Sequence, residues 1–244
     1  MNFSPGAWLP PPHPKPDRKS LMKRREFSLS AAAVLATGTL SKPALAQARQ
    51  FREGRDFRRL GTPVTPDAPA GKVEVIEFFW YSCPHCHAFE ATLSAWAKTA
   101  PKDMHLRRMP VAFNSSFVPQ QKLFYALEGM GKLGEMHTKV FRAIHEEKQK
   151  LDKDQDILAW AGKQGLNAAK FKEFYNSFNV SNQARRATQL QDIYGVEGVP
   201  AMGVAGKFYT DGQMTGGGLQ TVLQVVDYLV AMSRTPSSPA PDKP

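Results

Sequence analysis

Both cysteines of this 244-residue chain lie in one short segment, "YSCPHCHAFE", at residues 81–90. Three kinds of chemistry use cysteines at this spacing. Cys83-x-x-Cys86 can be a redox dithiol, and Cys83-x-x-Cys86-His87 can attach a haem of the c type. The same two cysteines can also supply half of the ligands of a zinc site.

A zinc site closed by protein side chains needs four ligands. Cys83 and Cys86 supply two, and the chain has no second cysteine pair. Three histidines, His105, His137 and His145, fall on segments that we expect to form separate elements, and we expect their side chains to be exposed. The sequence therefore predicts no metal and no cofactor other than a Cys83–Cys86 disulfide.

A haem site has little support in the flanking residues. The motif directly follows an apolar run typical of a strand, an axial ligand would have to come from elsewhere, and His87 is explained as a polar residue in a first helical turn. A purely structural disulfide would close so short a loop that it adds only about 2 kcal/mol of stability in the chain-entropy model. A redox dithiol is favoured, and a haem-bearing electron carrier stays the less favoured alternative.

Cys83 falls at an expected strand-to-helix turn, where free backbone N–H groups and the helix dipole would point at its sulfur. Pro84 suits the first helical turn, because its missing N–H would have no partner there. Lowering a cysteine pKa by about three units from ~8.5 takes roughly 4 kcal/mol, of which the dipole supplies at most ~2 kcal/mol. We expect N–H···S bonds and His85 to supply the rest. A stabilised thiolate favours the reduced form, so the disulfide would be a strong oxidant.

Two acidic residues flank the motif. Glu77 lies inside the apolar run "VEVIEFFW", where a carboxylate is costly to bury. We expect it to be partly neutralised or solvated through a channel, so that it could accept the proton of Cys86. The alternative is a strand residue that reaches solvent. Glu90 fits an ordinary residue on a helix surface equally well.

The surrounding pattern predicts the elements that position this motif. Residues 72–80 form a β-branched and aromatic run typical of a buried strand, and residues 84–100 carry apolar positions at helical spacing. Residues 104–113 predict a second strand, which a right-handed crossover would place parallel to the first. Residues 117–194 show only helical patterns, residues 201–204 and 207–209 predict a hairpin, and residues 218–233 predict an amphipathic helix.

This order predicts an α/β protein with a thioredoxin-like fold, a four-stranded sheet and an inserted all-helical domain. Residues 49–112 and 188–233 would form the thioredoxin-like domain, residues 113–187 the helical insertion, and residues 234–244 a disordered tail.

The first 48 residues are typical of a targeting leader. Translation is expected to begin at Met22, followed by a basic segment, an apolar segment of about 14 residues and small-x-small cleavage sites. A membrane span needs roughly 20 residues, so we expect a cleaved signal peptide at residues 22–46 or 22–48. The pair Arg24-Arg25 leaves the Sec and twin-arginine routes both open. Export predicts a periplasmic protein, in a compartment where a dithiol can form a disulfide.

The formal net charge of +10 gives little indication of a nucleic-acid partner. The first 48 residues contain 7 basic and 2 acidic residues, so half of the charge belongs to the predicted leader. The remaining arginine pairs, at residues 58–59, 107–108 and 185–186, are scattered. We therefore expect no nucleic-acid binding.

The segments "EFFWYSCPHCHAFE" and "GVPAMGVAGKFYTDG" resemble the two active-site segments of DsbA-type thiol:disulfide oxidoreductases. The resemblance covers residues 51–232 and includes the helical insertion between the two segments. It implies that Cys83 is the attacking, solvent-facing cysteine and Cys86 the buried resolving cysteine, with Pro84 and His85 as the dipeptide that tunes them. DsbA is itself the standard example of a strongly lowered cysteine pKa and an oxidising disulfide.

The resemblance also implies roles for the second segment. Pro200 would be a cis-proline facing the disulfide, and the backbone of Val199 would bind an extended substrate segment. Met202 would line the substrate groove, and Gly203 would leave a gap beside it. Arg108 lies near a position where some relatives have lysine, and His87 replaces an aromatic residue.

The function that follows is donation of the Cys83–Cys86 disulfide to reduced, unfolded exported proteins through a mixed disulfide on Cys83. The resemblance implies reoxidation by a quinone-linked membrane partner of the DsbB type. A monomer is expected, because only about 20 residues precede the fold and dimeric isomerases carry an extra module there. A same-fold isomerase or reductase and a non-catalytic chaperone remain alternatives.

Overall fold

The computed structural model describes residues 50–234. The predicted leader and residues 235–244 of the predicted tail lie outside this range. The last helix, α7 (Leu219–Arg234), includes Arg234, so this residue belongs to the helix and not to a tail. No helix within the described range is long and apolar enough to cross a membrane.

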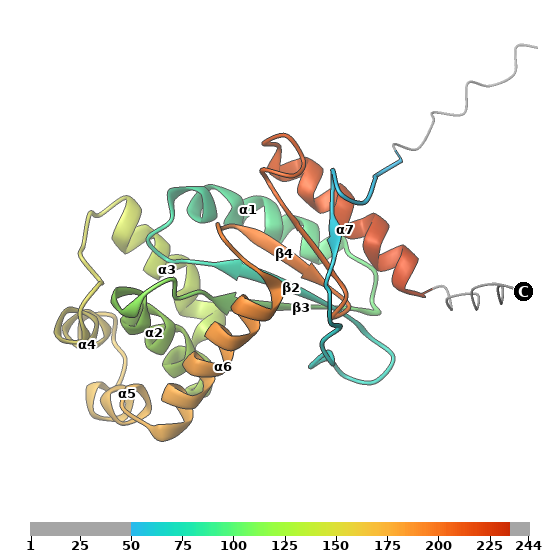
Figure 1. Cartoon of the computed structure of the whole chain (residues 1–244). Coiled ribbons are helices and arrows are strands. Elements are labelled where there is room, and N and C mark those ends of the chain that lie inside the picture. Colours follow the sequence, from blue (N-terminus) through green and yellow to red (C-terminus); the bar gives the residue numbers. More distant parts are fainter. Residues whose placement is uncertain (1–49, 235–244) are drawn as a thin grey trace, which may run out of the picture. The chain divides into compact units, whose positions relative to one another are not determined.

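Five strands form one mixed sheet in the order β1-β5-β4-β2-β3 (Figure 1). They are β1 (Arg58–Arg59), β2 (Val73–Phe79), β3 (Met104–Pro110), β4 (Ala201–Val204) and β5 (Phe208–Asp211). β2 pairs parallel with β3, and β4 pairs antiparallel with both β2 and β5. The predicted parallel crossover and hairpin are confirmed. The predicted count of four strands is wrong, because two adjacent arginines give no alternating apolar signal for β1.

Two layers of helices cover the sheet. α1 (Pro84–Thr99) and α7 pack on one face, in a core that contains Val75 of β2, Leu93 of α1 and Val226 of α7. Ile76 belongs to the second core, which the inserted helices complete. Because neighbouring residues of a strand point to opposite faces, Glu77 lies on the same face as Val75, under the helix that carries the cysteines.

The insertion is entirely helical, as predicted, and lies beside the sheet in Figure 1. After a short 3-10 helix, η1 (Ser115–Phe117), it comprises α2 (Val118–Gly129), α3 (Leu133–His145), α4 (Asp154–Lys163), α5 (Ala168–Tyr175) and α6 (Phe178–Tyr194). α6 is continuous, so the predicted boundary between residues 187 and 188 falls inside a helix. Gly195 ends α6 in the left-handed conformation, with φ at 58°, as glycine readily does.

β4 does not offer its side chains to a substrate groove. Met202 has no exposed surface and packs in the core under α7. Gly203 points to the other face, where a Cβ atom would lie 2.4 Å from the Tyr194 ring. The prediction that Met202 lines a groove with a gap at Gly203 is therefore not supported, because α7 covers one side chain position and Tyr194 fills the other.

The Gly203→Ala variant tests this packing. The added methyl group has to displace a fully buried aromatic ring, and such overpacking lowers the free energy of unfolding by about 1–3 kcal/mol. Urea denaturation measures the loss. Gly61→Ala is the matched control, since nothing lies within 4 Å of a Cβ atom at that position. Equal stabilities of the two variants would contradict the assigned packing.

Candidate active site

The two cysteines sit where β2 gives way to α1. The Cys83 N–H donates to the Trp80 carbonyl over 3.0 Å and closes the turn between the strand and the helix. Cys83 is the N-cap residue of α1, with extended backbone, and Pro84 occupies the first turn of the helix. Cys83 thus lies at the strand-to-helix turn, as predicted, with its sulfur near the N-terminus of α1.

The two sulfurs have different surroundings. Both thiols are free, but Cys83 is 7% exposed whereas Cys86 has no exposed surface. The pKa of Cys83 is lowered to about 6, first by the hydrogen bond from the Cys86 thiol. Burial opposes this, and the backbone N–H groups of Cys86 and His85 and the charge of His85 add to the lowering. Burial raises the pKa of Cys86 far above its usual range, and the neighbouring Cys83 raises it further.

The order of these causes differs from the sequence-based expectation. We expected His85 and the helix N-terminus to supply most of the effect, whereas the structure gives the largest contribution to Cys86. The resolving cysteine therefore also stabilises the thiolate of its partner. This contribution depends on three-dimensional geometry and could not be ranked from the motif.

The cis-proline loop reaches the dithiol from a distant part of the chain. The Val199-Pro200 peptide bond is cis, as the resemblance implied. The Cys83 thiol donates to the Val199 carbonyl across 3.4 Å, although 116 residues separate the two in sequence. The structure thus brings Cys83, Val199 and Pro200 together.

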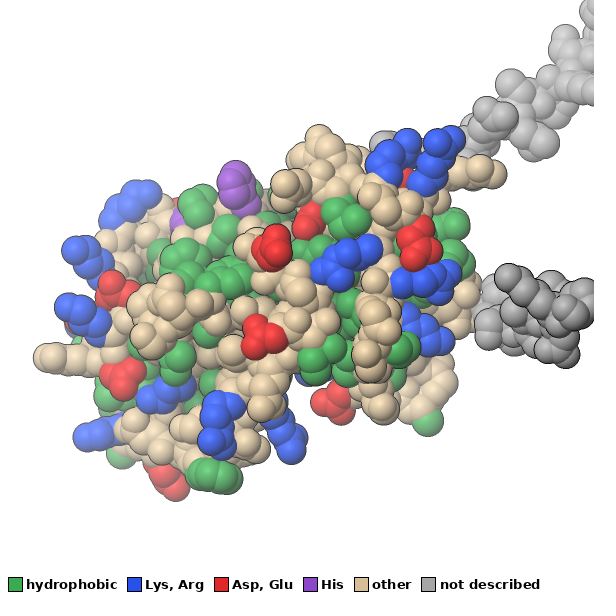
Figure 2. All heavy atoms as spheres, in the orientation of Figure 1, with side chains coloured by type: hydrophobic (Ala, Val, Ile, Leu, Met, Phe, Trp, Pro, Cys, Tyr) green, Lys and Arg blue, Asp and Glu red, His purple; other side chains and the backbone are tan. Residues whose placement is uncertain are grey.

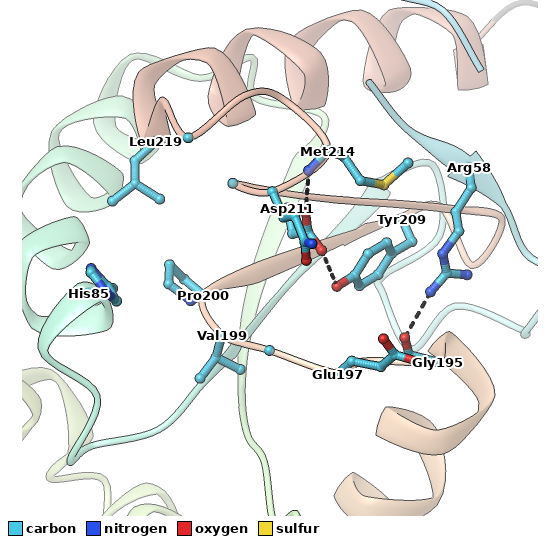
Figure 3. A pocket seen from close by; sticks show the side chains of 14 residues that line it. Arg58, His85, Gly195, Glu197, Val199, Pro200, Tyr209, Asp211, Met214 and Leu219 are labelled. Carbon is cyan, nitrogen blue, oxygen red and sulfur yellow. Dashed lines mark hydrogen bonds between the residues drawn. The ribbon is translucent and has the colours of Figure 1, made fainter. Parts of the chain in front are cut away.

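A pocket of about 950 Å³ opens beside this loop (Figure 3). His85, Val199 and Pro200 line it near the cysteines, and Figure 3 shows Arg58 and Tyr209 at the other end. Further lining comes from the segment after β5, where Met214 and Leu219 add apolar surface. Four of the lining residues were not predicted from the sequence, because β1, β5, the loop after β5 and α7 meet only in the folded chain: Arg58, Tyr209, Met214 and Leu219.

Beneath the cysteines lies a buried group of charges. Arg108 of β3 places Nη2 at 2.7 Å from Oε1 of Glu90 and Nε at 3.2 Å from Oε2 of Glu77. The Arg108–Glu90 contact is an aligned hydrogen bond, and the Arg108–Glu77 contact is an ion pair without that alignment. Ser94 also donates to Glu90, over 2.7 Å. Neither carboxylate reaches solvent freely, so the surface alternatives for Glu77 and Glu90 are wrong.

The two carboxyl groups differ in their affinity for a proton. Burial raises the pKa of Glu77 to about 8, since the nearby Arg108 only partly offsets it. Burial also acts on Glu90, but the hydrogen bond from His137, the charge of that ring once it is protonated at low pH, and then Arg108 and Ser94 hold the pKa of Glu90 below the usual value. At neutral pH Glu90 is therefore ionised, while Glu77 holds a proton close to the cysteines.

Contrary to the expectation from the sequence, the three histidines do not all lie on the surface. His137 is only 5% exposed, and it shares α3 with His145. The His145 ring stacks on His87 at 4.8 Å between centroids, with an angle of 17° between the planes. The expectation of three exposed histidines on separate elements is wrong, because His137 and His145 share one helix, His137 is buried, and His105 and His145 are half-buried. Within the described residues, no three His, Cys, Asp or Glu side chains are placed to hold a metal ion.

A dithiol at the start of a helix that follows a central strand, faced by a cis-proline loop, defines a thiol:disulfide oxidoreductase of the thioredoxin fold. Residues 74–224 match the model of the DSBA-like thioredoxin domain family. The chain belongs to this family.

Named relatives agree with this assignment. The thiol:disulfide interchange protein DsbA of Bordetella parapertussis is 40% identical over 206 residues, which cover 84% of this chain and 96% of the relative. DsbA of Pseudomonas aeruginosa PAO1 is 38% identical over 207 residues, covering 85% and 97% of the two chains. A crystal structure of Pseudomonas aeruginosa DsbA superposes with a TM-score of 0.71 at 38% identity, over 75% of this chain and 95% of the other. The oxidoreductase NmDsbA1 of Neisseria meningitidis gives a TM-score of 0.65 at 28% identity, over 75% and 94%.

The Cys86→Ala variant tests the origin of the acidic thiol. We expect wild-type Cys83 to titrate near pH 6, measured by the ultraviolet absorbance of its thiolate. Without the Cys86 thiol the largest stabilising hydrogen bond is lost, so the pKa of Cys83 should rise toward the ordinary cysteine value. Cys83→Ser should show no titration in this range. An unchanged midpoint in Cys86→Ala would contradict the assigned cause.

The Glu77→Gln variant tests the buried carboxyl group. The folded protein holds the Glu77 proton up to about pH 8, whereas the unfolded chain releases it near its usual pKa of 4.5. Between these values the folded state binds the extra proton, so wild-type stability falls as pH rises, by up to about 1.4 kcal/mol per unit. Glutamine does not titrate. The difference between the free energies of unfolding of Glu77→Gln and wild type should therefore shift in favour of Glu77→Gln as the pH rises from 4.5 to about 8. Above about pH 8 this difference should stay constant.

Urea denaturation of both reduced proteins across this pH range measures the difference. The exposed Glu173→Gln is the matched control and should follow the wild-type curve. Parallel curves for Glu77→Gln and wild type would show that Glu77 is ionised throughout.

Proposed function

We propose that this oxidoreductase donates its Cys83–Cys86 disulfide to reduced exported proteins. The observation that carries the proposal is the asymmetry of the two cysteines: Cys83 keeps a small exposed surface and has a low pKa, whereas Cys86 has no exposed surface and a high pKa. A stabilised Cys83 thiolate favours the dithiol form, so the disulfide tends to leave the protein. The same asymmetry directs attack to Cys83, because Cys86 is out of reach.

In the first step, a substrate thiolate attacks the Cys83 sulfur. The Cys83–Cys86 bond breaks, the electron pair goes to Cys86, and Cys86 takes up a proton. Glu77 is protonated at neutral pH and is proposed as the source of that proton. A second substrate thiolate then attacks the substrate sulfur of the mixed disulfide and releases Cys83 as a thiolate. Two electrons pass from the substrate to the protein, and the substrate gains a disulfide.

The pocket beside the cis-proline loop is the proposed substrate-binding site. The Val199 carbonyl lies 3.4 Å from the Cys83 sulfur, and in a mixed disulfide, where this sulfur carries no proton, the carbonyl would be free to accept a substrate N–H. His85, Met214 and Leu219 would contact side chains next to the substrate cysteine. Pro84 and His85 remain the proposed tuning residues. Met202 makes no contact with the substrate in this proposal, because it has no exposed surface.

The proposal extends to location and partners. A leader at residues 22–46 or 22–48, removed after Sec or twin-arginine export, would deliver the protein to the periplasm. Each turnover leaves the dithiol reduced, so a partner must remove two electrons, and the family favours a quinone-linked membrane protein of the DsbB type. Lys and Arg side chains are scattered among Asp and Glu over the face in Figure 2, which favours protein substrates over nucleic acid. A monomer is sufficient for the proposed reaction.

Equilibration with glutathione tests the direction of the reaction. The protein is brought to equilibrium in mixtures of reduced and oxidised glutathione, free thiols are alkylated, and the two forms are separated by mass. We expect the dithiol form to predominate even where oxidised glutathione is in excess. A preference for the disulfide would contradict the proposal and indicate a reductase.

The order of attack is tested with a reduced peptide that contains two cysteines. Oxidised wild type should form the peptide disulfide, and Cys83→Ser should form none. Cys86→Ala, activated as a mixed disulfide with a small thiol, should capture a single-cysteine version of the peptide on Cys83, because no second substrate thiol is then present to release it. Full peptide oxidation by Cys83→Ser would overturn the assignment.

A further inference from the structure

One face of α3 contacts both sides of the dithiol. His137, Phe141 and His145 are spaced by four residues, so they lie in one stripe along the helix. The Phe141 ring packs at 5.1 Å from the Tyr81 ring and 5.8 Å from the His87 ring. Tyr81 lies two residues before Cys83, and His87 directly follows Cys86. The inserted helix therefore touches the active-site turn before and after the cysteines.

Tyr81 is held from α3 by two hydrogen bonds. The Tyr81 hydroxyl lies 2.9 Å from Nδ1 of His137, and Nε2 of His145 lies 2.8 Å from the Tyr81 carbonyl. Tyr81 has no exposed surface, so the hydroxyl and the carbonyl need such partners. Its side chain and its main chain are therefore both fixed by the insertion.

The hydrogen-bond network assigns the tautomer of His137. Its Nε2 lies 3.3 Å from Oε2 of Glu90, which is ionised, so Nε2 carries the proton and donates it. Nδ1 is then an acceptor and takes the Tyr81 hydroxyl proton. Burial lowers the pKa of His137, so the ring is neutral at physiological pH. Both nitrogen atoms are used, and any apolar replacement leaves Tyr81 and Glu90 each without one partner.

We propose that His137 is a positioning residue of the redox site, which fixes the turn before Cys83 through Tyr81 and fixes Glu90 beside Arg108. His145 secures the same turn through the Tyr81 carbonyl. The helical insertion thereby sets how well the Cys83 sulfur meets its hydrogen-bond donors. The inference deepens the proposed function, and it concerns the dithiol whichever way the electrons flow.

The test compares two substitutions at one position. His137→Leu removes both hydrogen bonds, whereas His137→Gln keeps an acceptor for Tyr81 and a donor for Glu90. We expect His137→Leu to shift the equilibrium with glutathione toward the disulfide by roughly three- to tenfold, the size of one lost hydrogen bond. The pKa of Cys83 should rise with it, measured by thiolate absorbance. His137→Gln should return both values to within about twofold of wild type.

Two further variants separate positioning from general stability. Tyr81→Phe breaks the same hydrogen bond from its other end, so it should shift the glutathione equilibrium in the same direction, and the double variant with His137→Leu should fall short of the sum. Ile157→Val in α4, which packs on α2 and α5, should lower the melting temperature and leave the glutathione equilibrium unchanged.

The outcomes are distinct. A lowered melting temperature of His137→Leu with a wild-type equilibrium and a wild-type Cys83 pKa would overturn the inference, since His137 would then be only a core residue. If His137→Leu does not fold, Tyr81→Phe and His137→Gln carry the same comparison. A wild type that prefers the disulfide would refute the proposed direction of the reaction, but the difference between variants would still test His137.

Discussion

The site depends on the unequal solvation of two sulfur atoms one helical turn apart. Because Cys86 is buried, its thiol keeps its proton, and because that proton points at Cys83, the neighbouring thiolate is stabilised. Exchange of the two environments would abolish both effects. The fold creates this inequality by ending a central strand just before Cys83 and beginning a helix just after it, so that Cys83 keeps a small exposed surface and Cys86 has none.

The buried charges beneath the cysteines follow from the same constraint. A thiolate that forms in a buried position is unfavourable until it gains a proton, and solvent does not reach Cys86. Arg108 is shared by the two carboxyl groups of Glu77 and Glu90. Of these two groups, only Glu90 also accepts hydrogen bonds from His137 and Ser94. The negative charge therefore settles on Glu90, and Glu77 is left to hold a proton. Two carboxyl groups whose environments separate their pKa values can take different roles within one site. Here Glu90 carries the negative charge and Glu77 holds the proton.

Much of this was readable from the sequence, for local reasons. The apolar run before Cys83, the helical spacing after it and Pro84 between them specify a strand, a turn and a helix through nearest neighbours alone. The cis-proline at residue 200 and its position opposite Cys83 came from the resemblance, since nothing local relates residues 116 positions apart. β1 was not predicted because two residues carry no periodic signal, and its partner strand β5 lies far along the chain, with Arg58 paired to Tyr209.

The errors share a different cause. Met202 and Gly203 were read from their neighbours in sequence, but α7 and Tyr194 decide what surrounds them. His137 was taken as a surface residue because one polar residue on a helix usually faces water. Its spacing from Phe141 and His145 was the available signal, since three such residues at four-residue intervals form one stripe, and a stripe that includes a large apolar ring is usually turned inward.

The stripe of His137, Phe141 and His145 on α3 connects the helical insertion to the dithiol, in the proposal made above. The lining of the pocket beside the cis-proline comes from the first turn of α1, the strands β1 and β5, the first residue of α7 and the loops beside them, and none of its residues belongs to α3. A substrate can therefore occupy the pocket without displacing the helix that holds Tyr81. The proposed binding surface and the proposed support of the dithiol are thus separate parts of the fold. On this proposal, substitutions in α3 change the oxidising strength of the disulfide, and the lining of the pocket sets the choice of substrate.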